Sequence, residues 1–211
     1  MESRAKTVYS KVNKEISMSY IPGHFATNHS HINYFIDLTE LLTSHYHANL
    51  AAEVLADHYQ TQPIDTIICM DDTQMIAAFL AKKLADSYNG INADKRIHVL
   101  IPEFNTNGQM IFRDNLQKML MQKNVLLLIS SATTGKTIKR SLECIAYYGG
   151  TSAGVAALFS ATSEIVGVKV FSIFGSEDVP DYQTFSYREC PFCQRQEKID
   201  ALVNSNGYMK L

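Results

Sequence analysis

The residues best suited to chemistry lie near the middle of the chain, in a small polar loop over residues 130–137. The five apolar residues VLLLI (125–129) predict a short buried strand before the loop, and apolar positions three and four apart predict a helix over 138–146 after it. Backbone N–H groups at the start of a helix, together with Gly135 and the cation Lys136, suit a phosphate group. The alternative is an ordinary strand-to-helix turn with a threonine cap.

A second polar group follows the apolar run IDTIICM (64–70), which predicts a buried parallel strand. Asp71, Asp72 and Thr73 stand at its carboxyl end, before a helix expected over 74–85. Ligands of open α/β sheets bind beyond the carboxyl ends of strands, so two carboxylates here could hold a metal ion or a ribose. An equally weighted interpretation is that Asp72 or Thr73 only caps the helix.

Two other groups contain residue types that bind metals. His24, His29 and His31 are close in sequence but lack a neighbouring acid or thiolate, so we interpret this stretch as a strand that presents polar side chains at one edge of a cleft. Cys190 and Cys193 form one C-x-x-C pair, which is half of a tetrahedral zinc site. Nearby histidines or a second pair could complete it. A redox motif and a plain reduced turn are the alternatives, the reduced turn is favoured, and no metal ligand is assigned.

Composition and charge argue against nucleic-acid and membrane binding. A chain of 211 residues suits a single domain, and a net charge of −2 with scattered Lys and Arg gives no nucleic-acid surface. No apolar run reaches the length of a membrane span, and no charged-then-apolar signal stands at the N-terminus. We therefore expect a cytoplasmic protein with no membrane partner.

The remaining segments complete an alternating order of strands and helices. Residues 1–20 have apolar positions four apart and predict an amphipathic helix, which Pro22-Gly23 ends. The further expectations are a helix over 45–59, a strand over 96–101, a mobile loop over 102–109, partial helix over 110–121, strands over 154–159 and 168–174, and an irregular tail from 177. This order indicates an α/β fold with a doubly wound, mostly parallel sheet.

Two nucleotide-binding patterns compete for the central loop. Gly135-Lys136-Thr137 fits the end of a P-loop, but Ser130 stands where that motif needs its first glycine. The segment ATTGKT (132–137) resembles instead the phosphate loop of type I phosphoribosyltransferases.

The resemblance to that family extends over most of the chain and is closest to orotate phosphoribosyltransferases. GHFATNHSHINYFIDL (23–38) is similar to their base-binding segment, and IICMDDTQMIAAFLA (67–81) to their diphosphate-loop strand and helix. PEFNTNGQ (102–109) falls where their catalytic hood loop lies. The resemblance implies a type I phosphoribosyltransferase fold with a small hood from about 1–45 and 177–211 over a core at 46–176.

Several family residues are replaced. Ile129 and Ser130 stand in place of the acidic pair that holds the ribose, and the hood loop keeps its glycine at Gly108 but not its lysines and histidine. The arginine that anchors orotate aligns near Ala161. Removing one electrostatic donor at a reacting centre typically lowers the rate about 10²–10³-fold, so these losses weaken the usual mechanism.

The resemblance nevertheless implies roles for particular residues. The function expected from it is transfer of phosphoribose to a nucleobase in nucleotide metabolism, such as pyrimidine biosynthesis, by a homodimer that uses Mg²⁺. A catalytically degenerate sensor of nucleotide or phosphoribosyl diphosphate, and a P-loop-like NTPase, are the alternatives. The residues expected to act are Asp71, Asp72 and Arg113 in catalysis; Ala132, Thr133, Thr134, Gly135, Lys136 and Thr137 on the phosphate; Asp71, Asp72 and Thr73 on the diphosphate; and Asn33, Tyr34 and Phe104 on the base.

Overall fold

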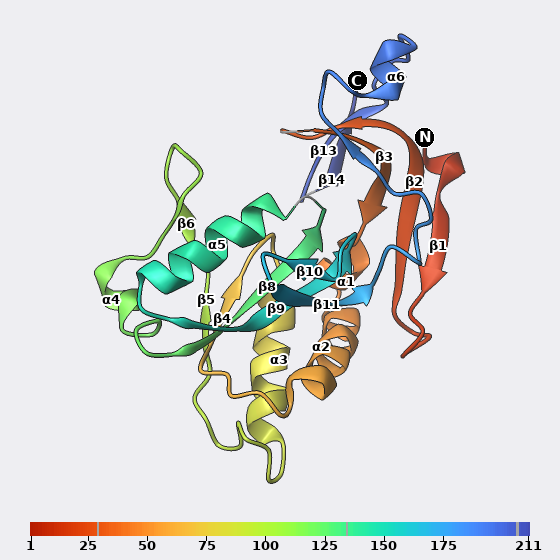
Figure 1. Cartoon of the computed structure of the whole chain (residues 1–211). Coiled ribbons are helices and arrows are strands. Elements are labelled where there is room, and N and C mark those ends of the chain that lie inside the picture. The colour runs from red at the N-terminus through yellow and green to blue at the C-terminus, as the bar shows by residue number, and fades with distance from the viewer. Residues whose placement is uncertain (29, 134, 206) are drawn as a thin grey trace.

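A six-stranded sheet with the order β10-β11-β9-β8-β4-β5 forms the centre of the molecule in the computed structural model, which describes residues 1–28, 30–133, 135–205 and 207–211 (Figure 1). Every neighbouring pair is parallel except β10 with β11. All residues of β4 are buried, as expected for a strand covered on both faces. The strands are β4 (Thr66–Cys69), β5 (His98–Leu100), β8 (Asn124–Ala132), β9 (Thr151–Ser160), β10 (Glu164–Ile165) and β11 (Val168–Phe174).

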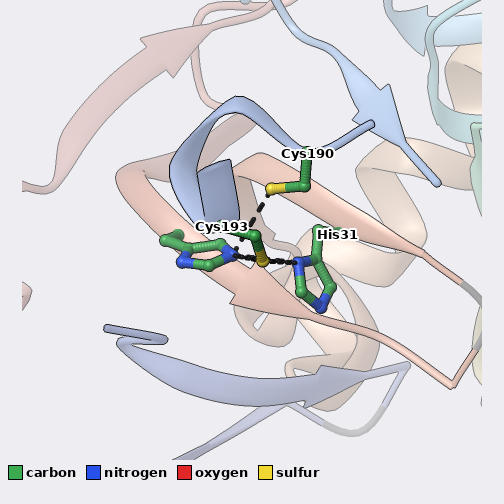
Figure 2. A group of neighbouring side chains, drawn as sticks. His31, Cys190 and Cys193 are labelled. Atoms are coloured by element: carbon green, nitrogen blue, oxygen red, sulfur yellow. Dashed lines mark hydrogen bonds between the residues drawn. The ribbon is translucent and has the colours of Figure 1, made fainter. Parts of the chain in front are cut away.

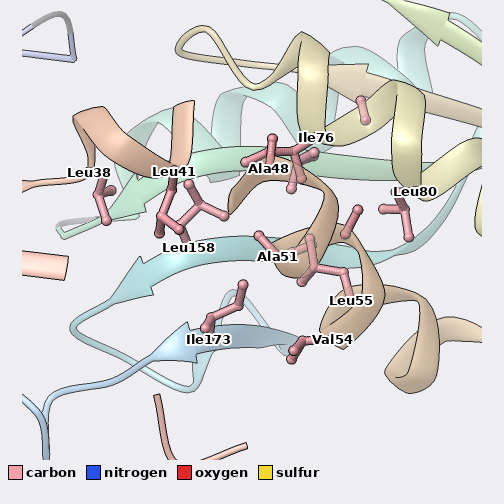
Figure 3. Packing of buried hydrophobic residues seen from close by; sticks show 14 of the residues in the cluster. Leu38, Leu41, Ala48, Ala51, Val54, Leu55, Ile76, Leu80, Leu158 and Ile173 are labelled. Atoms are coloured by element: carbon pink, nitrogen blue, oxygen red, sulfur yellow. The ribbon is translucent and has the colours of Figure 1, made fainter. Parts of the chain in front are cut away.

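Helices cover both faces of this core sheet. The helices α2 (His45–Tyr59) and α3 (Gln74–Asp86) pack on one face, where Leu55 and Leu80 belong to the same buried cluster as Leu158 (Figure 3). The helix α5 (Lys136–Tyr147) and the short helix α4 (Asp114–Gln117) lie on the other face. The doubly wound, mostly parallel sheet predicted from the sequence is therefore confirmed.

The strand order places a topological switch point between β4 and β8. After β4 the chain moves outward to β5, whereas after β8 it moves in the opposite direction to β9 and β11. The loops that follow β4 and β8 therefore diverge and leave a crevice at the carboxyl edge of the sheet, where α/β proteins bind ligands.

A second sheet, the hood sheet, combines the two ends of the chain. Its order is β12-β3-β2-β13-β14, with β1 paired to β2, and its buried side chains include Phe25, Phe35 and Val203. Figure 1 shows this sheet at the carboxyl edge of the core sheet. Its strands are β1 (Lys6–Tyr9), β2 (Ser17–Ala26), β3 (His31–Asp37), β12 (Thr184–Phe185), β13 (Ala201–Asn204) and β14 (Gly207–Lys210).

The remaining elements are short. A two-stranded hairpin of β6 (Glu103–Phe104) and β7 (Met110–Ile111) occupies the segment that the sequence predicted as a loop, and α4 is the helical part of 110–121. The others are η1 (Glu2–Arg4), α1 (Thr39–Thr43) and α6 (Pro191–Gln194).

The helix predicted over residues 1–20 is wrong. Ser10 begins a turn there, because its hydroxyl oxygen accepts the Val12 N–H at 3.2 Å and its own N–H donates to the Ile16 carbonyl at 2.8 Å. Local side-chain bonds of this kind compete with a helix. Pro22 does not end an element either, since β2 continues through it with a register shift between Pro22 and Phe25.

Two other predicted boundaries change. The tail from 177 contains three strands of the hood sheet rather than only irregular chain. β8 continues through Ala132, because Ser131 and Ala132 still pair with Phe159 and Ser160 of β9. β8 therefore ends at Ala132 and α5 begins at Lys136, so both elements extend into the segment 130–137 that was predicted as a loop.

Candidate functional site

A tight turn at the end of β4 presents Asp71 to the crevice. Asp71 and Asp72 both have positive φ, 53° and 62°, in a turn closed by the Thr73 N–H on the Met70 carbonyl at 3.2 Å. The buried Thr73 hydroxyl also donates to that carbonyl, at 2.8 Å. Non-glycine residues in this region are strained, and such strain gathers at functional sites. The turn therefore holds its first acidic side chain in place at an energetic cost.

The Asp71 carboxylate lies against the end of β8. The Ser130 hydroxyl donates to its Oδ2 at 3.4 Å, a long hydrogen bond. Burial raises the pKa of Asp71, and the charge of Asp72 acts in the same direction, while the bond from Ser130 opposes them. A carboxylate that is partly desolvated beside another acid favours a cation or a hydrogen-bond donor as its partner.

The loop after β8 depends on Gly135. This residue is the N-cap of α5 with φ of 70°, and its carbonyl accepts the Lys139 N–H at 2.9 Å. A Cβ at this position would lie 3.0 Å from two atoms of Ile165. Glycine satisfies both the backbone angle and the close packing. The start of α5 is thereby left open, with Lys136 and Thr137 exposed in its first turn.

A cleft of about 320 Å³ lies between the hood sheet and the carboxyl edge of the core sheet. One side is polar and comes from the ends of β4 and β8 and from the tail, and the other side is apolar and comes mainly from the hood sheet. The polar side includes Asp71, Ser130, Ser131, Thr133 and Tyr182, and the apolar side includes Ile32, Phe35, Ile36, Leu38, Leu42 and Val203. Its volume is within the range of small-molecule sites.

Tyr182 connects the tail to the loop after β8. Its hydroxyl hydrogen-bonds to Thr133 and Thr184, and burial raises its pKa to about 12, so the phenol stays neutral. Its ring packs edge-on to Phe159 at 5.4 Å. A second depression shares Thr133 and Tyr182 with the cleft and includes Ala161, near which the resemblance to orotate phosphoribosyltransferases would place an arginine.

Among the predicted site residues that the structure describes, Asp71 and Thr133 line the cleft and the others do not. Asp72 is exposed next to Asp71, and Arg113 and the three base-side residues lie elsewhere. The Asn33 amide donates to the Asp181 carbonyl at 2.6 Å and so ties β3 to the tail. Tyr34 packs edge-on to Tyr20. Phe104 is exposed on β6, and the Arg113 guanidinium is paired with Glu103, at 2.6 Å from Nη2 to Oε2.

The residues predicted to bind the phosphate have different surroundings. Thr133 lines the cleft, Lys136 and Thr137 stand at the start of α5, and Ala132 is buried inside β8. Thr134 lies outside the described residues. Sequence reasoning missed Tyr182, which lies in no strand, and within segment 23–38 it chose Asn33 and Tyr34 whereas Ile32, Phe35 and Ile36 line the cleft. Which side chains of β3 face the cleft depends on the hood sheet, and that sheet joins distant parts of the chain.

Cys190 and Cys193 lie beside His24 and His31, away from the cleft. His29, the third residue of the histidine group considered from the sequence, lies outside the described residues.

The short loop also bears on the P-loop alternative. A P-loop wraps its phosphates with a long glycine-rich segment between strand and helix. Here residues 133–135 separate β8 from α5, and Ser130, at the place of the first glycine, is buried within the strand. The geometry does not favour a P-loop.

No protein-family model matches the chain, and no curated protein matches it. Solved structures do match. Orotate phosphoribosyltransferase from Aeropyrum pernix is 19% identical with a TM-score of 0.54, covering 75% of this chain and 88% of its own. Adenine phosphoribosyltransferase from Thermoanaerobacter pseudethanolicus is 16% identical with a TM-score of 0.53, covering 82% and 96%. A phosphoribosyltransferase from Corynebacterium diphtheriae is 16% identical with a TM-score of 0.52, covering 76% and 90%.

These similarities define the architecture. The chain has the type I phosphoribosyltransferase fold, and the resemblance noted from the sequence is confirmed at that level. Both orotate and adenine enzymes appear among the similar structures, so the fold does not select a base. None of the helices in the described part of the chain has the length and apolar character needed to cross a membrane.

Proposed function

We propose that the cleft binds a 5′-phosphoribosyl ligand, either a nucleotide or phosphoribosyl diphosphate. The observation that supports this most is the two-sided cleft at the switch point. The loop after β8 and the start of α5 offer N–H groups, hydroxyls and Lys136 to a phosphate. Asp71 and Ser130 are placed for ribose hydroxyls. The apolar hood side, with Phe35 and Val203, suits a base.

Mg²⁺ suits the polar side of this cleft. Asp71 lines the cleft, exposed Asp72 follows it in the same turn, and their carboxylates together with the Ser130 hydroxyl offer the hard oxygen ligands that Mg²⁺ prefers. When bound, the ion would neutralise charge on a diphosphate group. The residues that would hold it are Asp71 and Asp72.

Transfer of phosphoribose to a nucleobase, in the manner of orotate phosphoribosyltransferases, is the enzymatic form of this proposal. The ribose becomes cationic as diphosphate leaves, so a carboxylate near it stabilises the reacting centre. The family's acidic pair is absent from β8, but Asp71 reaches the same strand end from the neighbouring loop, at Ser130. Asp71 would thus supply the negative charge.

Binding without turnover is the second candidate, and a specific observation favours it. The β6–β7 hairpin at 103–111 carries no Lys, Arg or His, and Arg113 just beyond it is already paired with Glu103. Few cations are available to the leaving diphosphate. A homodimer, which the fold's resemblance suggests, would allow a partner to supply others.

Calorimetric titration with phosphoribosyl diphosphate and Mg²⁺, and separately with nucleoside monophosphates, tests the binding proposal. We expect micromolar affinity, lowered about tenfold in Thr133→Val because a hydrogen bond to a charged group is lost. Thr61→Val is the matched control, since Thr61 is exposed and lies outside the cleft. Equal affinities in both variants, or no binding by the wild type, would contradict the proposal.

Release of diphosphate in the presence of orotate, adenine and other bases then separates the two candidates. Turnover that falls in Asp71→Asn supports the transferase. Tight binding with no diphosphate released from any base supports the sensor. ATP hydrolysis lost in Lys136→Ala would instead indicate an NTPase.

A further inference from the structure

Two histidines of the hood sheet and the two cysteines of the tail converge on one point. Cys190 and Cys193 flank the start of α6, whereas His24 is in β2 and His31 begins β3. The two ring nitrogens and two sulfurs that face the centre all lie within 4.8 Å of one another. Figure 2 shows the two cysteine sulfurs and the His31 ring directed toward this centre. It is the one group of this kind in the described part of the chain.

Four of the six separations between these atoms are close to those of a tetrahedral zinc site. Zinc bonds of about 2.3 Å to sulfur and about 2.05 Å to nitrogen give edges of about 3.6 Å between sulfur and nitrogen and about 3.3 Å between nitrogens. The His24 Nε2 lies 3.5 Å from Cys190 Sγ and 3.6 Å from Cys193 Sγ. The His31 Nδ1 lies 3.2 Å from Cys193 Sγ and 2.9 Å from His24 Nε2. The pair of nitrogens is shorter than the zinc-bound edge and the longest pair of the group, at up to 4.8 Å, is longer, so zinc binding would adjust both.

The His24 ring is oriented as a metal ligand. Its Nδ1 lies 3.0 Å from the Glu197 carbonyl oxygen, which can only accept, so Nδ1 carries the proton. The lone pair of Nε2 then points at the two sulfurs. Histidines that bind metals usually donate their other N–H to a carbonyl or carboxylate in this way. Phe192 also stacks on the ring, with centroids 5.1 Å apart.

The surroundings close the site on most sides. His24, His31 and Cys190 are buried, whereas Cys193 is exposed. Tyr187 packs edge-on to the His31 ring at 5.0 Å. Four protein ligands leave no open coordination position, which is the pattern of structural rather than catalytic zinc.

We propose that His24 Nε2, His31 Nδ1, Cys190 Sγ and Cys193 Sγ bind a structural Zn²⁺ ion. Each thiol releases its proton to solvent on binding, so two thiolates and two neutral imidazoles balance the charge of the ion. The ion joins the β2–β3 hairpin to the tail across 166 residues of sequence between His24 and Cys190.

The zinc site would also support the cleft. Ile32 follows His31 in β3 and lines the apolar side, and Thr27 and Asn28 line it from the β2–β3 turn. The tail near the cysteines contributes few buried apolar side chains, so a metal cross-link replaces the core that this part of the hood lacks. Removing the ion should loosen this side of the cleft without altering the core sheet.

Metal analysis of the whole chain tests the proposal. Protein produced with zinc in the medium should carry about one Zn²⁺ per chain, and Cys190→Ser and Cys193→Ser less than about one tenth of that. Cys144→Ser is the matched control and should keep the full content, because the Cys144 thiol donates to the Met110 carbonyl and is not part of the group. Zinc content unchanged in both tail variants would place any bound ion elsewhere and overturn the proposal.

A second measurement covers variants that fail to fold. The wild-type protein is stripped with a chelator and titrated with Zn²⁺ or Co²⁺ while its melting temperature and absorption are followed. Zinc should raise the melting temperature in a concentration-dependent way, and Co²⁺ should show sulfur-to-metal charge transfer and intense tetrahedral bands. A folded protein that binds neither ion overturns the proposal. So does a denatured thiol titration that finds Cys190 and Cys193 joined in a disulfide.

Discussion

Gly135→Ala tests whether the loop between β8 and α5 is built as described. Gly135 has φ of 70°, in the region that disfavours side chains, and an added Cβ would lie 3.0 Å from Cδ1 and Cγ2 of Ile165. Ile165 is 8% exposed, in a two-residue strand paired with β11, so its side chain has little room to move. The substitution therefore adds backbone strain and overpacking together.

The two contributions can be estimated separately. A side chain in the left-handed region costs about 1–2 kcal/mol. Forcing a methyl group into a packed site typically costs about 1–3 kcal/mol. Their sum is about 2–5 kcal/mol for Gly135→Ala, which lowers the melting temperature by roughly 4–20 °C in a chain of this size.

Gly167 provides a matched control for the strain. Its φ is 76°, close to that of Gly135, but a Cβ there would meet nothing within 4 Å. Gly167→Ala should therefore cost only the backbone contribution, about 1–2 kcal/mol, or roughly 2–8 °C. The difference between the two variants measures the contact with Ile165.

Thermal unfolding followed by circular dichroism or calorimetry gives both values. Equal losses in the two variants would refute the close packing of Gly135 on Ile165. No loss in either would refute the positive φ at these positions. Ligand titration of the folded variants adds a readout of the proposed phosphate site, which Gly135→Ala should weaken and Gly167→Ala should not.

Three further substitutions test other contacts. Because burial raises the pKa of Asp71, the folded state holds the proton of this carboxyl more tightly, so the contribution of Asp71 to the free energy of unfolding is greatest below about pH 4 and falls as pH rises through the folded pKa. Asp71→Asn should therefore raise the melting temperature at pH 7 and remove this contribution, and a pH profile identical to that of the wild type would contradict the burial. Tyr59→Phe removes a buried hydroxyl that donates to the Val155 carbonyl at 2.9 Å and should cost about 1 kcal/mol in denaturant unfolding, whereas a neutral result would mean that the bond is absent. Thr73→Val should cost about 1–3 kcal/mol by losing the bond to the Met70 carbonyl, while Thr73→Ser keeps the hydroxyl and should lose less; equal losses would exclude that bond as the cause.

The sequence pattern predicted the core sheet and its helices because each of these elements has a recognisable pattern within its own residues. The segment 64–70 is mostly apolar and the segment 125–129 wholly so, as expected of strands buried on both faces, and they became β4 and β8. The helices α2 and α3 followed from their three- and four-residue spacing. Asp71 and Thr133 could be placed at the carboxyl edge on the same grounds, since strand ends in a parallel sheet share that edge.

The hood could not be predicted in this way. Its strands are half exposed and gain their stability from partners far along the chain, as when Phe25 of β2 pairs with Ala201 of β13. The four-residue spacing of the apolar residues in 1–20 is compatible with a helix. No short-range signal marks the β1–β2 hairpin that forms instead. The base-side residues chosen from the resemblance, such as Tyr34 and Phe104, therefore missed the cleft that the hood sheet actually lines.

By itself, the sequence determined the doubly wound core and the polar groups at the ends of β4 and β8, because burial on both faces and helical periodicity are properties of contiguous residues. Only the tertiary structure decided the shape of the cleft and which side chains lie next to Cys190 and Cys193. Those two thiols meet His24 and His31 because β12 and β13 add to the hood sheet beside β3 and β2. Pairing between distant strands is governed by the packing of the whole chain, which no local pattern contains.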